Sequence, residues 1–313
     1  MSLKSEILEE LRRRGGYVSG EELARSLNKS RTAVWKAVNA LRNEGYPVEA
    51  HTKKGYRLCG DTDVLNAEEI LRLCKTKIKV FYLDSVDSTN NYAKKQIAQG
   101  EKDIFLVAAA EQTAGRGRQG KAFFSPKGTG IYMSLAVHPD APLQSAVSAT
   151  TAAAVAVCRA IEKISDKQPG IKWVNDVYLD GKKICGILTE AVSDFESGTV
   201  SSVIIGIGIN ISTEQFPADV ENGGSLGPGI GRAKLIAAVS DELLKTINSD
   251  YNDFIAYYRS RSIVIGKEIR FLENGVWQTA KAEGVDSRGG LEIVLKDGVR
   301  RTLRSGEISI RKV

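Results

Sequence analysis

The sequence predicts an α+β chain of three domains: a small helical domain with a β-hairpin, a larger domain with a mixed sheet, and a small β-barrel. Three observations support this prediction. The chain has 313 residues, enough for two or three domains of about 100–200 residues each. Its first fifth is basic, whereas the remainder is almost neutral. Its last segment reads as closely spaced short strands with glycine turns between them.

Composition narrows the classes of function. Apolar residues make up 42% of the chain, which supports ordinary packed cores, and no apolar run approaches the ~18 residues that span a bilayer. Residues 1–60 carry 12 Lys/Arg and 7 Asp/Glu, so +5 of the total charge of +6 lies there. This asymmetry favours a polyanionic partner for that segment. The charged N-terminus does not resemble a signal peptide, so we expect a cytoplasmic protein with no membrane association.

Cysteine and histidine are scarce and scattered. No two cysteines form a C-x-x-C pair, so we expect small buried hydrophobes rather than a zinc or redox motif. The cysteines are Cys59, Cys74, Cys158 and Cys185. Only His51 and His138 are present, which disfavours a Ser-His-Asp hydrolase or a histidine-rich metal centre. We therefore expect any chemistry to depend largely on Lys, Arg, Asp, Asn and a metal–nucleotide complex.

Residues 1–62 are expected to form a winged helix-turn-helix domain. Ser5 to Arg14 places apolar residues on one helical face before two glycines. Ser19 and Glu22 form a capping box that starts a second helix. A tight turn then leads to Ser30, which is suited to cap a third helix. Two short helices joined in this way are typical of a DNA-reading unit.

Polar and basic residues of the last helix and the following hairpin predict contact with DNA. Early residues of the last helix would meet the bases, and residues 48–58 read as a hairpin wing whose lysines suit phosphates. The candidate DNA-binding residues are Ser30, Arg31, Thr32, Trp35, Lys36, Asn39, Lys53 and Lys54. The alternatives are a small helical module that binds another protein and, for Trp35, a packing role.

Residues 63–262 mix strands with helices, and their local hairpins predict an α+β domain with a mixed sheet. Asp180-Gly181-Lys182 is a hairpin turn signal between two apolar segments. The expected strands are 80–83, 104–110, 171–179, 184–192 and 203–211; the expected helices are 145–165 and one long helix over 230–252.

A glycine–arginine segment, Glu111 to Lys121, is the most informative part of the chain. Glycine permits close backbone approach, and arginine offers a planar fork of donors for carboxylate or phosphate oxygens. The segment predicts a mobile cationic loop that closes over an anionic ligand; the alternative is a solvated turn. It is not a P-loop, because Ala122 stands where a P-loop requires Ser or Thr.

Three further polar clusters interrupt the central domain. Ser88-Thr89-Asn90 follows a strand and suits a ureido or carboxamide group, although its first residues could instead cap a helix. Residues 172–176 place a lysine, an amide and a carboxylate near a strand end, where they could hold a metal–triphosphate. Lys183 leads into a strand of small residues, where a lysine would face a ligand rather than solvent.

Residues 263–313 predict a small SH3-like barrel, because short strands alternate with glycine turns. The expected strands are 268–272, 276–284, 291–295, 299–303 and 307–311. Such a domain either supports ligand binding or only stabilises its neighbour, and the sequence leaves both readings open.

Taken together, the clusters resemble the biotin protein ligase family over essentially the whole chain. The motifs that carry the resemblance are Ser88-Thr89-Asn90, Gly115-Arg116-Gly117-Arg118-Gln119-Gly120, Lys172-Trp173-Val174-Asn175-Asp176, Lys183 with Gly186-Ile187-Leu188, and Gly206-Ile207-Gly208-Ile209-Asn210. With its helix-turn-helix, the chain is similar to the bifunctional form, a ligase that also represses biotin genes. The resemblance implies a biotin/lipoate-ligase-like catalytic domain followed by an SH3-like domain.

The resemblance implies an ATP-dependent biotin–[acetyl-CoA-carboxylase] ligase. Such an enzyme joins biotin to ATP as biotinyl-5′-AMP, with Mg²⁺ on the nucleotide, and transfers biotin to a lysine of a biotin carboxyl carrier domain. The resemblance also implies operator DNA binding by a ligand-promoted homodimer with biotinyl-AMP as corepressor. The rival readings are another acyl-adenylate enzyme, such as a lipoate ligase, and a regulator that binds biotin without catalysis.

The resemblance also assigns roles to residues. Lys183, Arg118 and Asp176 would be catalytic, with Lys183 bridging the biotin carboxylate and the α-phosphate. The biotin site would comprise Ser88, Thr89, Asn90, Gln112, Gly115, Arg116, Gly117, Arg118 and Lys183. The nucleotide site would comprise Arg118, Lys172, Asn175, Asp176 and Asn210, with Asn175 and Asp176 beside Mg²⁺. Two departures from the family pattern are Val174, where proline is usual, and Phe123, where tryptophan is common.

Overall fold

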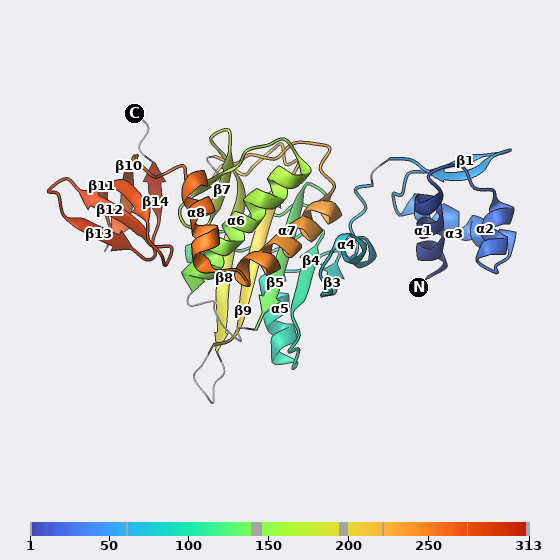
Figure 1. Ribbon diagram of the computed structural model, residues 1–313, viewed down its shortest axis with the longest axis horizontal. Coiled ribbons are helices and arrows are strands. Elements are labelled where there is room, and N and C mark those ends of the chain that lie inside the picture. Colours follow the sequence, from blue (N-terminus) through green and yellow to red (C-terminus); the bar gives the residue numbers. More distant parts are fainter. Residues whose placement is uncertain are drawn as a thin grey trace. The chain divides into compact units, whose positions relative to one another are not determined.

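The computed structural model describes residues 2–60, 62–138, 146–193, 200–220, 222–273 and 275–310. The chain divides into two compact units, Met1–Arg72 with Gly231–Ala233, and Leu73–Ile230 with Lys234–Val313. Figure 1 labels the helices and strands along the chain. The division into three domains at 62 and 262 stays a prediction.

The first unit contains a winged helix-turn-helix, as predicted. Its elements are α1 (Leu3–Arg14), α2 (Gly20–Ser26), α3 (Arg31–Asn43), β1 (Val48–His51), β2 (Gly55–Leu58) and α4 (Ala67–Leu73), with β1 and β2 paired antiparallel. Ser19 and Glu22 form the predicted capping box, and Ser30 Oγ accepts from Ala33 N at 3.1 Å. These caps satisfy N–H groups that a helix leaves unpaired at its start. The apolar faces form one core that includes Ile7, Leu11, Leu23, Val34 and Leu41.

A buried carboxylate fixes α4 to the rest of this unit. The Glu69 side chain is 3% exposed and lies 2.5 Å from Arg12 Nη2 and 2.8 Å from Arg72 Nη2. The Tyr46 hydroxyl donates to Glu69 Oε1 at 3.1 Å. Burial by itself raises the pKa of Glu69, but the hydrogen bonds from the two arginines outweigh burial and hold that pKa below its usual value. The carboxylate is therefore charged at neutral pH.

The second unit is built on a seven-stranded mixed sheet of order β3-β4-β5-β9-β8-β7-β6. Only β3 and β4 are parallel among its paired strands, all of which lie in the described part of the chain. The strands are β3 (Lys79–Leu83), β4 (Phe105–Ala109), β5 (Gly130–Val137), β6 (Gly170–Lys172), β7 (Asp176–Leu179), β8 (Lys182–Ser193) and β9 (Val200–Asn210). Every residue of β4 and β5 is buried, so both faces of these strands are covered.

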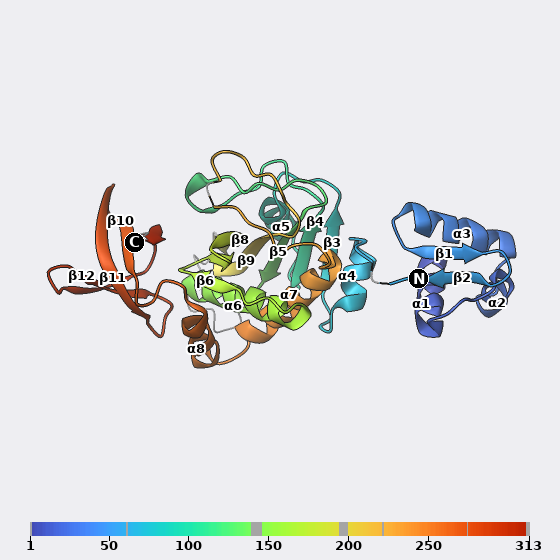
Figure 2. The same cartoon turned by 90° about the horizontal axis from the view of Figure 1, so that it is seen from above.

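Helices cover both faces of this sheet. Figure 2 shows α5 (Thr89–Ala98) on one side and α6 (Ala146–Ile164) with α7 (Arg232–Ile247) on the other. A short 3₁₀ turn, η1 (Arg118–Gly120), lies in the glycine–arginine segment, and α8 (Tyr251–Arg261) follows α7. Among the residues described, none of the helices combines the length and hydrophobicity that a membrane crossing requires.

Two elements that were expected to be continuous are each divided, so both predictions are wrong. The strand expected over 171–179 forms β6 and β7, which pair with each other around Trp173-Val174-Asn175; the Trp173–Val174 peptide bond is cis. The helix expected over 230–252 is broken into α7 and α8. The Asp250 carboxylate accepts from Asn252 N at 2.8 Å and caps a new helix there.

The C-terminal part of this unit is a five-stranded antiparallel sheet of order β13-β12-β11-β10-β14. Its strands are β10 (Glu268–Glu273), β11 (Val276–Val285), β12 (Leu291–Leu295), β13 (Arg300–Leu303) and β14 (Ile308–Ile310). In residues 264–273 and 275–310, the strands form the small antiparallel domain that the sequence predicted, and no strand pairing joins β13 to β14. Residues 145 and 311, expected to begin a helix and to end a strand, lie outside the described residues.

Candidate active site

The polar clusters predicted from the sequence meet in one cavity of about 520 Å³. Its walls come from α5, the glycine–arginine segment, strands β6 to β9 and residues 306–308. The predicted residues that line it are Ser88, Thr89, Asn90, Gln112, Arg116, Gly117, Arg118, Lys172, Asn175, Asp176, Lys183 and Asn210. Gly115 lies behind this lining: a Cβ there would come within 2.4 Å of Phe123 O. Glycine is needed at that position for close backbone packing.

Glycines form the floor of the cavity. A Cβ on Gly206 of β9 would lie 2.3 Å from Asn90 Oδ1, and a Cβ on Gly208 would lie 2.3 Å from the Phe123 ring. Gly208 pairs with Gly186 of β8, where a Cβ would meet the same ring at 3.2 Å. Only residues without a side chain leave room for Asn90 and Phe123 to lie against the sheet. The glycines of the G-I-G-I-N motif therefore create space over β9.

Uncharged side chains form a continuous hydrogen-bond chain in this cavity. Thr89 donates from its backbone N and its hydroxyl to Gln112 Oε1, at 2.9 and 3.1 Å. Gln112 Nε2 donates to Ser125 Oγ at 2.9 Å. Ser134 Oγ lies 2.7 Å from Thr89 Oγ1 and 2.6 Å from Asn90 Oδ1. Amides and hydroxyls are thus fixed in orientation beside the floor.

Helix capping does not explain the hydroxyl cluster. Ser88 occupies the N-cap position of α5, but its side chain makes no capping hydrogen bond. Thr89 is the first residue of α5, and its hydroxyl contacts Gln112 and Ser134. Both side chains are buried, so the cluster faces the cavity rather than the start of the helix.

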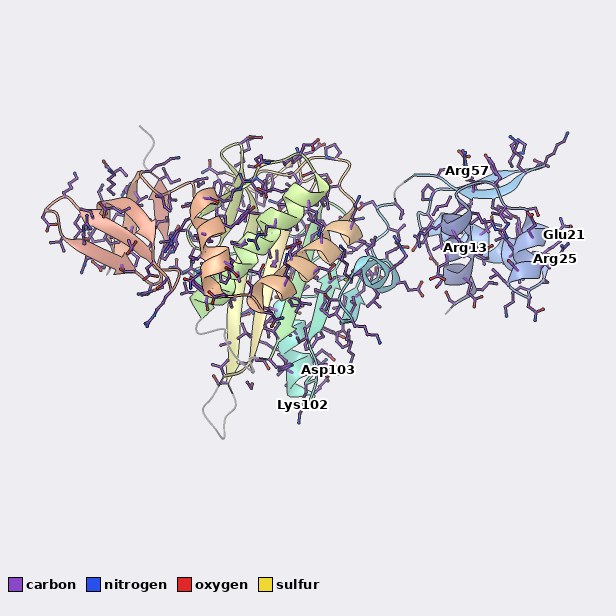
Figure 3. The ribbon with its side chains drawn as sticks, viewed as in Figure 1. Arg13, Glu21, Arg25, Arg57, Lys102 and Asp103 are labelled. Atoms are coloured by element: carbon purple, nitrogen blue, oxygen red, sulfur yellow. The ribbon has the colours of Figure 1, made fainter. Side chains whose placement is uncertain are left out.

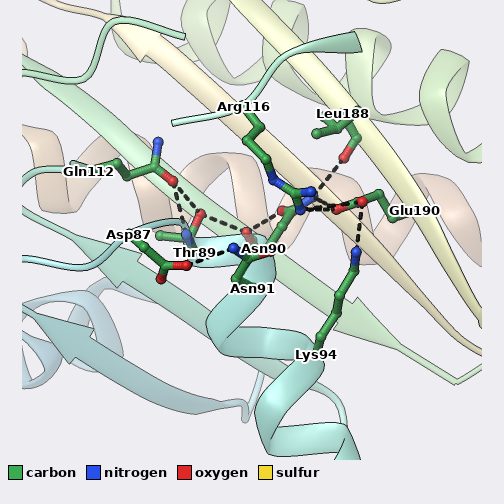
Figure 4. A network of polar contacts seen from close by, with 10 residues as sticks. Asp87, Thr89, Asn90, Asn91, Lys94, Gln112, Arg116, Leu188 and Glu190 are labelled. Carbon is green, nitrogen blue, oxygen red and sulfur yellow. Dashed lines mark hydrogen bonds and ion pairs between the residues drawn. The ribbon is translucent and has the colours of Figure 1, made fainter. Parts of the chain in front are cut away.

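Glu190 of β8 connects the hydrogen-bond network around Thr89 and Asn90 to the glycine–arginine segment, as Figure 4 shows. Asn90 Nδ2 donates to Glu190 Oε2 at 2.8 Å, and Arg116 Nη2 donates to the same oxygen at 3.0 Å. Lys94 Nζ lies 2.7 Å from Glu190 Oε1. Burial alone raises the pKa of Glu190, but the hydrogen bonds from Lys94 and Asn90, with the nearby positive charges, hold that pKa below its usual value.

The charged part of the cavity centres on Lys183 and Asp176. Lys183 Nζ lies 2.7 Å from Asp176 Oδ1, and the Lys183 side chain is 35% exposed. Arg118 Nη1 donates to Asn175 Oδ1 at 3.0 Å, which ties η1 to the β6–β7 turn. Burial lowers the pKa of Lys172; the Asp176 charge opposes this effect and the Lys183 charge adds to it. This part of the cavity therefore brings the cations Arg118, Lys172 and Lys183 together with the Asp176 carboxylate.

The uncharged and charged parts are displaced from each other along β9. Asn90 lies over Gly206 of β9. Asp176 of β7 pairs with Gly186 of β8, and Gly186 pairs with Gly208 of β9, two residues further along that strand. Two residues along a strand span roughly 7 Å. The arrangement suits a ligand that has an uncharged polar end and an anionic end.

Segments remote in the sequence complete the rim. Glu307 lines the cavity, and its Oε1 lies 2.6 Å from Lys121 Nζ. Phe216 and Val220 line it from the segment before α7. Asn210 Nδ2 donates to Gly224 O at 3.0 Å and holds that segment against β9.

Asn175 and Asp176 fit a magnesium ion that arrives with a nucleotide. No group of three His, Cys, Asp or Glu side chains suited to a metal is found in the ranges that the structure describes. Mg²⁺ commonly takes one or two protein carboxylates and completes its shell with phosphate oxygens and water. One carboxylate and one amide oxygen in a cationic cavity match that pattern.

The DNA-binding residues predicted for the first unit lie at its surface. Those exposed are Ser30, Arg31, Thr32, Trp35, Lys36, Lys53 and Lys54, and Asn39 is half-buried. Trp35 is 55% exposed, so it does not pack inside this unit. Figure 3 shows further charged residues on the same unit, with Arg25 and Glu21 on α2 and Arg57 on the hairpin strand β2. The Arg57 guanidinium lies 4.8 Å from the centre of the Tyr17 ring.

The sequence reasoning missed Ser134, Glu190 and Glu307. Ser134 and Glu190 had a visible signal, because each is a polar side chain inside a largely apolar strand. Glu307 had no such signal, because its place at the cavity depends on how the C-terminal sheet packs.

Comparison with known families gives three matches. Residues 82–210 match the biotin/lipoate A/B protein ligase family, residues 4–57 match an HTH domain, and residues 264–311 match the biotin protein ligase C-terminal domain. The bifunctional ligase/repressor BirA of Bacillus subtilis (strain 168) is 36% identical over 96% of this chain and 96% of its own length. That of Escherichia coli (strain K12) is 29% identical over 95% of this chain and 94% of its own length.

Solved structures also match this chain. A biotin protein ligase from Aquifex aeolicus, in complex with biotin and ATP, matches 75% of this chain and 99% of its own, with 26% identity and a TM-score of 0.62. These similarities define the class of the catalytic region as that of a biotin protein ligase. With matches along almost its whole length and the N-terminal HTH domain, the chain belongs to the family of bifunctional biotin ligase/repressors. The resemblance seen in the motifs is confirmed.

Proposed function

We propose that the chain activates biotin with ATP to biotinyl-5′-AMP and transfers biotin to a lysine of a biotin carboxyl carrier domain. The observation that carries the proposal is the union, in one cavity, of an amide and hydroxyl network with the Lys183–Asp176 pair. Ser88, Thr89 and Asn90, with Gln112, suit the ureido ring of biotin. The cations suit its carboxylate and the phosphates of ATP.

In the first step, a biotin carboxylate oxygen attacks the α-phosphorus of ATP and pyrophosphate leaves. Both reactants are anions, so cations must offset their repulsion. Lys183 bridges the carboxylate and the α-phosphate, and Lys172 and Arg118 hold nucleotide phosphates. Asn175 and Asp176 would hold the Mg²⁺ that arrives with ATP, which would offset phosphate charge. Closure of the glycine–arginine segment then keeps water from the mixed anhydride.

In the second step, the neutral amine of the carrier lysine attacks the carbonyl carbon of the mixed anhydride. An amide bond forms as the bond between the carbonyl carbon and the AMP oxygen breaks, AMP leaves, and the amine nitrogen releases its proton to water. Asp176 orients the incoming amine, because a carboxylate accepts hydrogen bonds from it. The chemistry requires no histidine, in keeping with the histidine content of the chain.

The test is incubation with biotin, MgATP and a carrier domain, followed by mass spectrometry of the carrier. We expect ATP-dependent addition of one biotinyl group to a lysine. Labelling with lipoate instead of biotin would favour the rival acyl-adenylate enzyme. Binding of biotin without ATP-dependent labelling would favour a regulator that lacks catalysis.

We also propose that the chain represses biotin genes in the cytoplasm by binding operator DNA, with biotinyl-5′-AMP as corepressor. The exposed side chains of α3 and the basic character of residues 1–60 support this role. A single winged unit makes few base contacts, so the specific complex is a ligand-promoted homodimer on two half-sites.

A further inference from the structure

Glu190 has no role in the proposed function, yet its carboxylate joins β8 to two other segments. Asn90 and Lys94 come from α5, and Arg116 comes from the glycine–arginine segment (Figure 4). Glu190 itself does not line the cavity, and its side chain is 21% exposed. A charge held in a strand at that burial needs partners, and here the partners are parts of the site.

We propose that Glu190 is a positioning residue that orients the Asn90 amide and anchors Arg116, so that biotin binding and closure of the glycine–arginine segment depend on the same carboxylate. This inference rests on the proposed function and adds to it a residue that touches neither substrate.

The orientation of Asn90 follows from hydrogen-bond chemistry. An ionised carboxylate only accepts hydrogen bonds, so it dictates which end of a neighbouring amide faces it. Asn90 Nδ2 donates to Glu190 Oε2 at 2.8 Å and to Leu188 O at 3.3 Å. Asn90 Oδ1 is therefore left beside Ser134 Oγ, over Gly206. A flipped amide would set its carbonyl oxygen against two acceptors, so Glu190 fixes an acceptor at this point of the cavity.

The anchoring of Arg116 uses the same oxygen. Arg116 Nη2 lies 3.0 Å from Glu190 Oε2, the oxygen to which Asn90 donates. Backbone hydrogen bonds from Phe123 N to Gly115 O and from Gly117 N to Lys121 O hold the segment to itself, and the Arg116 side chain adds a contact from the segment to β8. An ion pair with an arginine that is 40% exposed is weak by itself. The specific effect of this ion pair is to link the position of the glycine–arginine segment to the position of the Asn90 amide.

The test compares wild type with Glu190→Gln in the full chain, using biotin and MgATP. Glutamine keeps the size of the side chain but removes its charge and lets it donate. We expect KM for biotin to rise about tenfold, the effect of losing one charge-assisted hydrogen bond, with KM for ATP changed less than about twofold. Release of pre-formed biotinyl-5′-AMP should accelerate as well. A loss of general stability would not separate the two KM values in this way.

Lys94→Ala is the matched control. It removes one partner of the same carboxylate but leaves the Asn90 and Arg116 contacts in place, and we expect KM for biotin within about twofold of wild type. If Glu190→Gln does not fold, Glu190→Asp takes its place. Aspartate keeps the charge but is one methylene too short to hold both donors, so the same separation of KM values is expected.

A folded variant with wild-type KM for biotin and wild-type adenylate release would overturn the proposal. Equal losses in Lys94→Ala and Glu190→Gln would also overturn it, because local charge balance would then explain both. Failure of the proposed function is recognised separately, since wild type itself would then form no biotinyl-5′-AMP. In that case the affinity for biotin, measured by calorimetry, still compares Glu190→Gln and Lys94→Ala with wild type.

Discussion

Lys183 is the residue on which the proposed chemistry depends most. Lys183→Ala should slow biotinyl-5′-AMP formation by about 10²–10³, because it removes the cation between two reacting anions. The fold should persist, since the side chain is 35% exposed. Pyrophosphate release measures the rate, and Lys182→Ala, at the adjacent exposed lysine, should remain near wild type. A Lys183→Ala rate within tenfold of wild type would remove Lys183 from the mechanism.

We expect Arg118 to retain the biotinyl-5′-AMP product rather than to take part in its formation. Arg118→Ala should speed escape of biotinyl-5′-AMP more than it slows its formation, because the contact of Arg118 with Asn175 ties η1 to the site. Dissociation of pre-formed adenylate into excess unlabelled ligand gives the rate. Lys127→Ala, an exposed lysine beyond the segment, is the control. Collapsed synthesis with unchanged dissociation would instead make Arg118 part of the chemistry.

Sequence reasoning finds reactive residues more readily than the residues that position them. Lys183, Asp176 and the arginines stand out because their charges interrupt strands or glycine-rich loops. Glu190 lies 100 residues from Asn90, and Glu307 lies 186 residues from Lys121. Such partners are fixed only by strand order and sheet packing, which local patterns do not determine.

At the scale of elements, local signals predict where helices start better than where strands end. The Ser19 capping box and the turn at Asp180-Gly181-Lys182 are present as predicted. The β6–β7 turn was missed because Trp173-Val174-Asn175 has no glycine or proline to mark it. A long-range contact supports that turn: the Trp173 indole N–H donates to Gly289 O at 2.9 Å.

Helix α4 should depend on pH through Glu69. The pKa of this carboxyl is lowered in the folded state, so its stabilising effect is present above the ordinary pKa of about 4.5 and is lost as the pH falls through the lower, folded value. Glu69→Gln should lower the local unfolding free energy by about 2 kcal/mol at pH 7, through the loss of charged hydrogen bonds. Hydrogen exchange of the α1 and α4 amides measures it.

The exposed neighbour Glu68 provides the control for this experiment. Glu68 accepts from Ser5 Oγ at 2.8 Å, and glutamine keeps an oxygen that can accept there, so Glu68→Gln should leave exchange at α1 and α4 near wild type at both pH 7 and pH 4. Equal exchange rates in wild type and Glu69→Gln at pH 7 would show that the carboxylate does not hold α4.

At the scale of the whole molecule, deletion of residues 1–60 should abolish operator binding, because the exposed α3 residues and most of the net positive charge lie there. Fluorescence anisotropy with a biotin-operon fragment measures binding. Adenylate synthesis, measured by pyrophosphate release, should persist because the lining residues lie between Ser88 and Ile308. Retained DNA affinity after the deletion would place the DNA-binding surface elsewhere.

Corepression requires that the adenylate and DNA affect each other's binding. If biotinyl-5′-AMP tightens operator binding by some factor, operator DNA must tighten adenylate binding by the same factor. Anisotropy titrations of the full chain with and without biotinyl-5′-AMP measure one side of this cycle. Equal operator affinity in both titrations would leave an enzyme with a DNA-binding appendage and no ligand control.

The contribution of residues 306–308 to the cavity has a consequence for protein synthesis. The segment Met1–Arg72 leaves the ribosome well before Ile308, which is the last lining residue. At about 5–20 residues per second, the interval is on the order of tens of seconds. During that time a nascent chain can carry a DNA reader without a complete ligand site. Dependence on the corepressor would then keep unfinished chains off the operator.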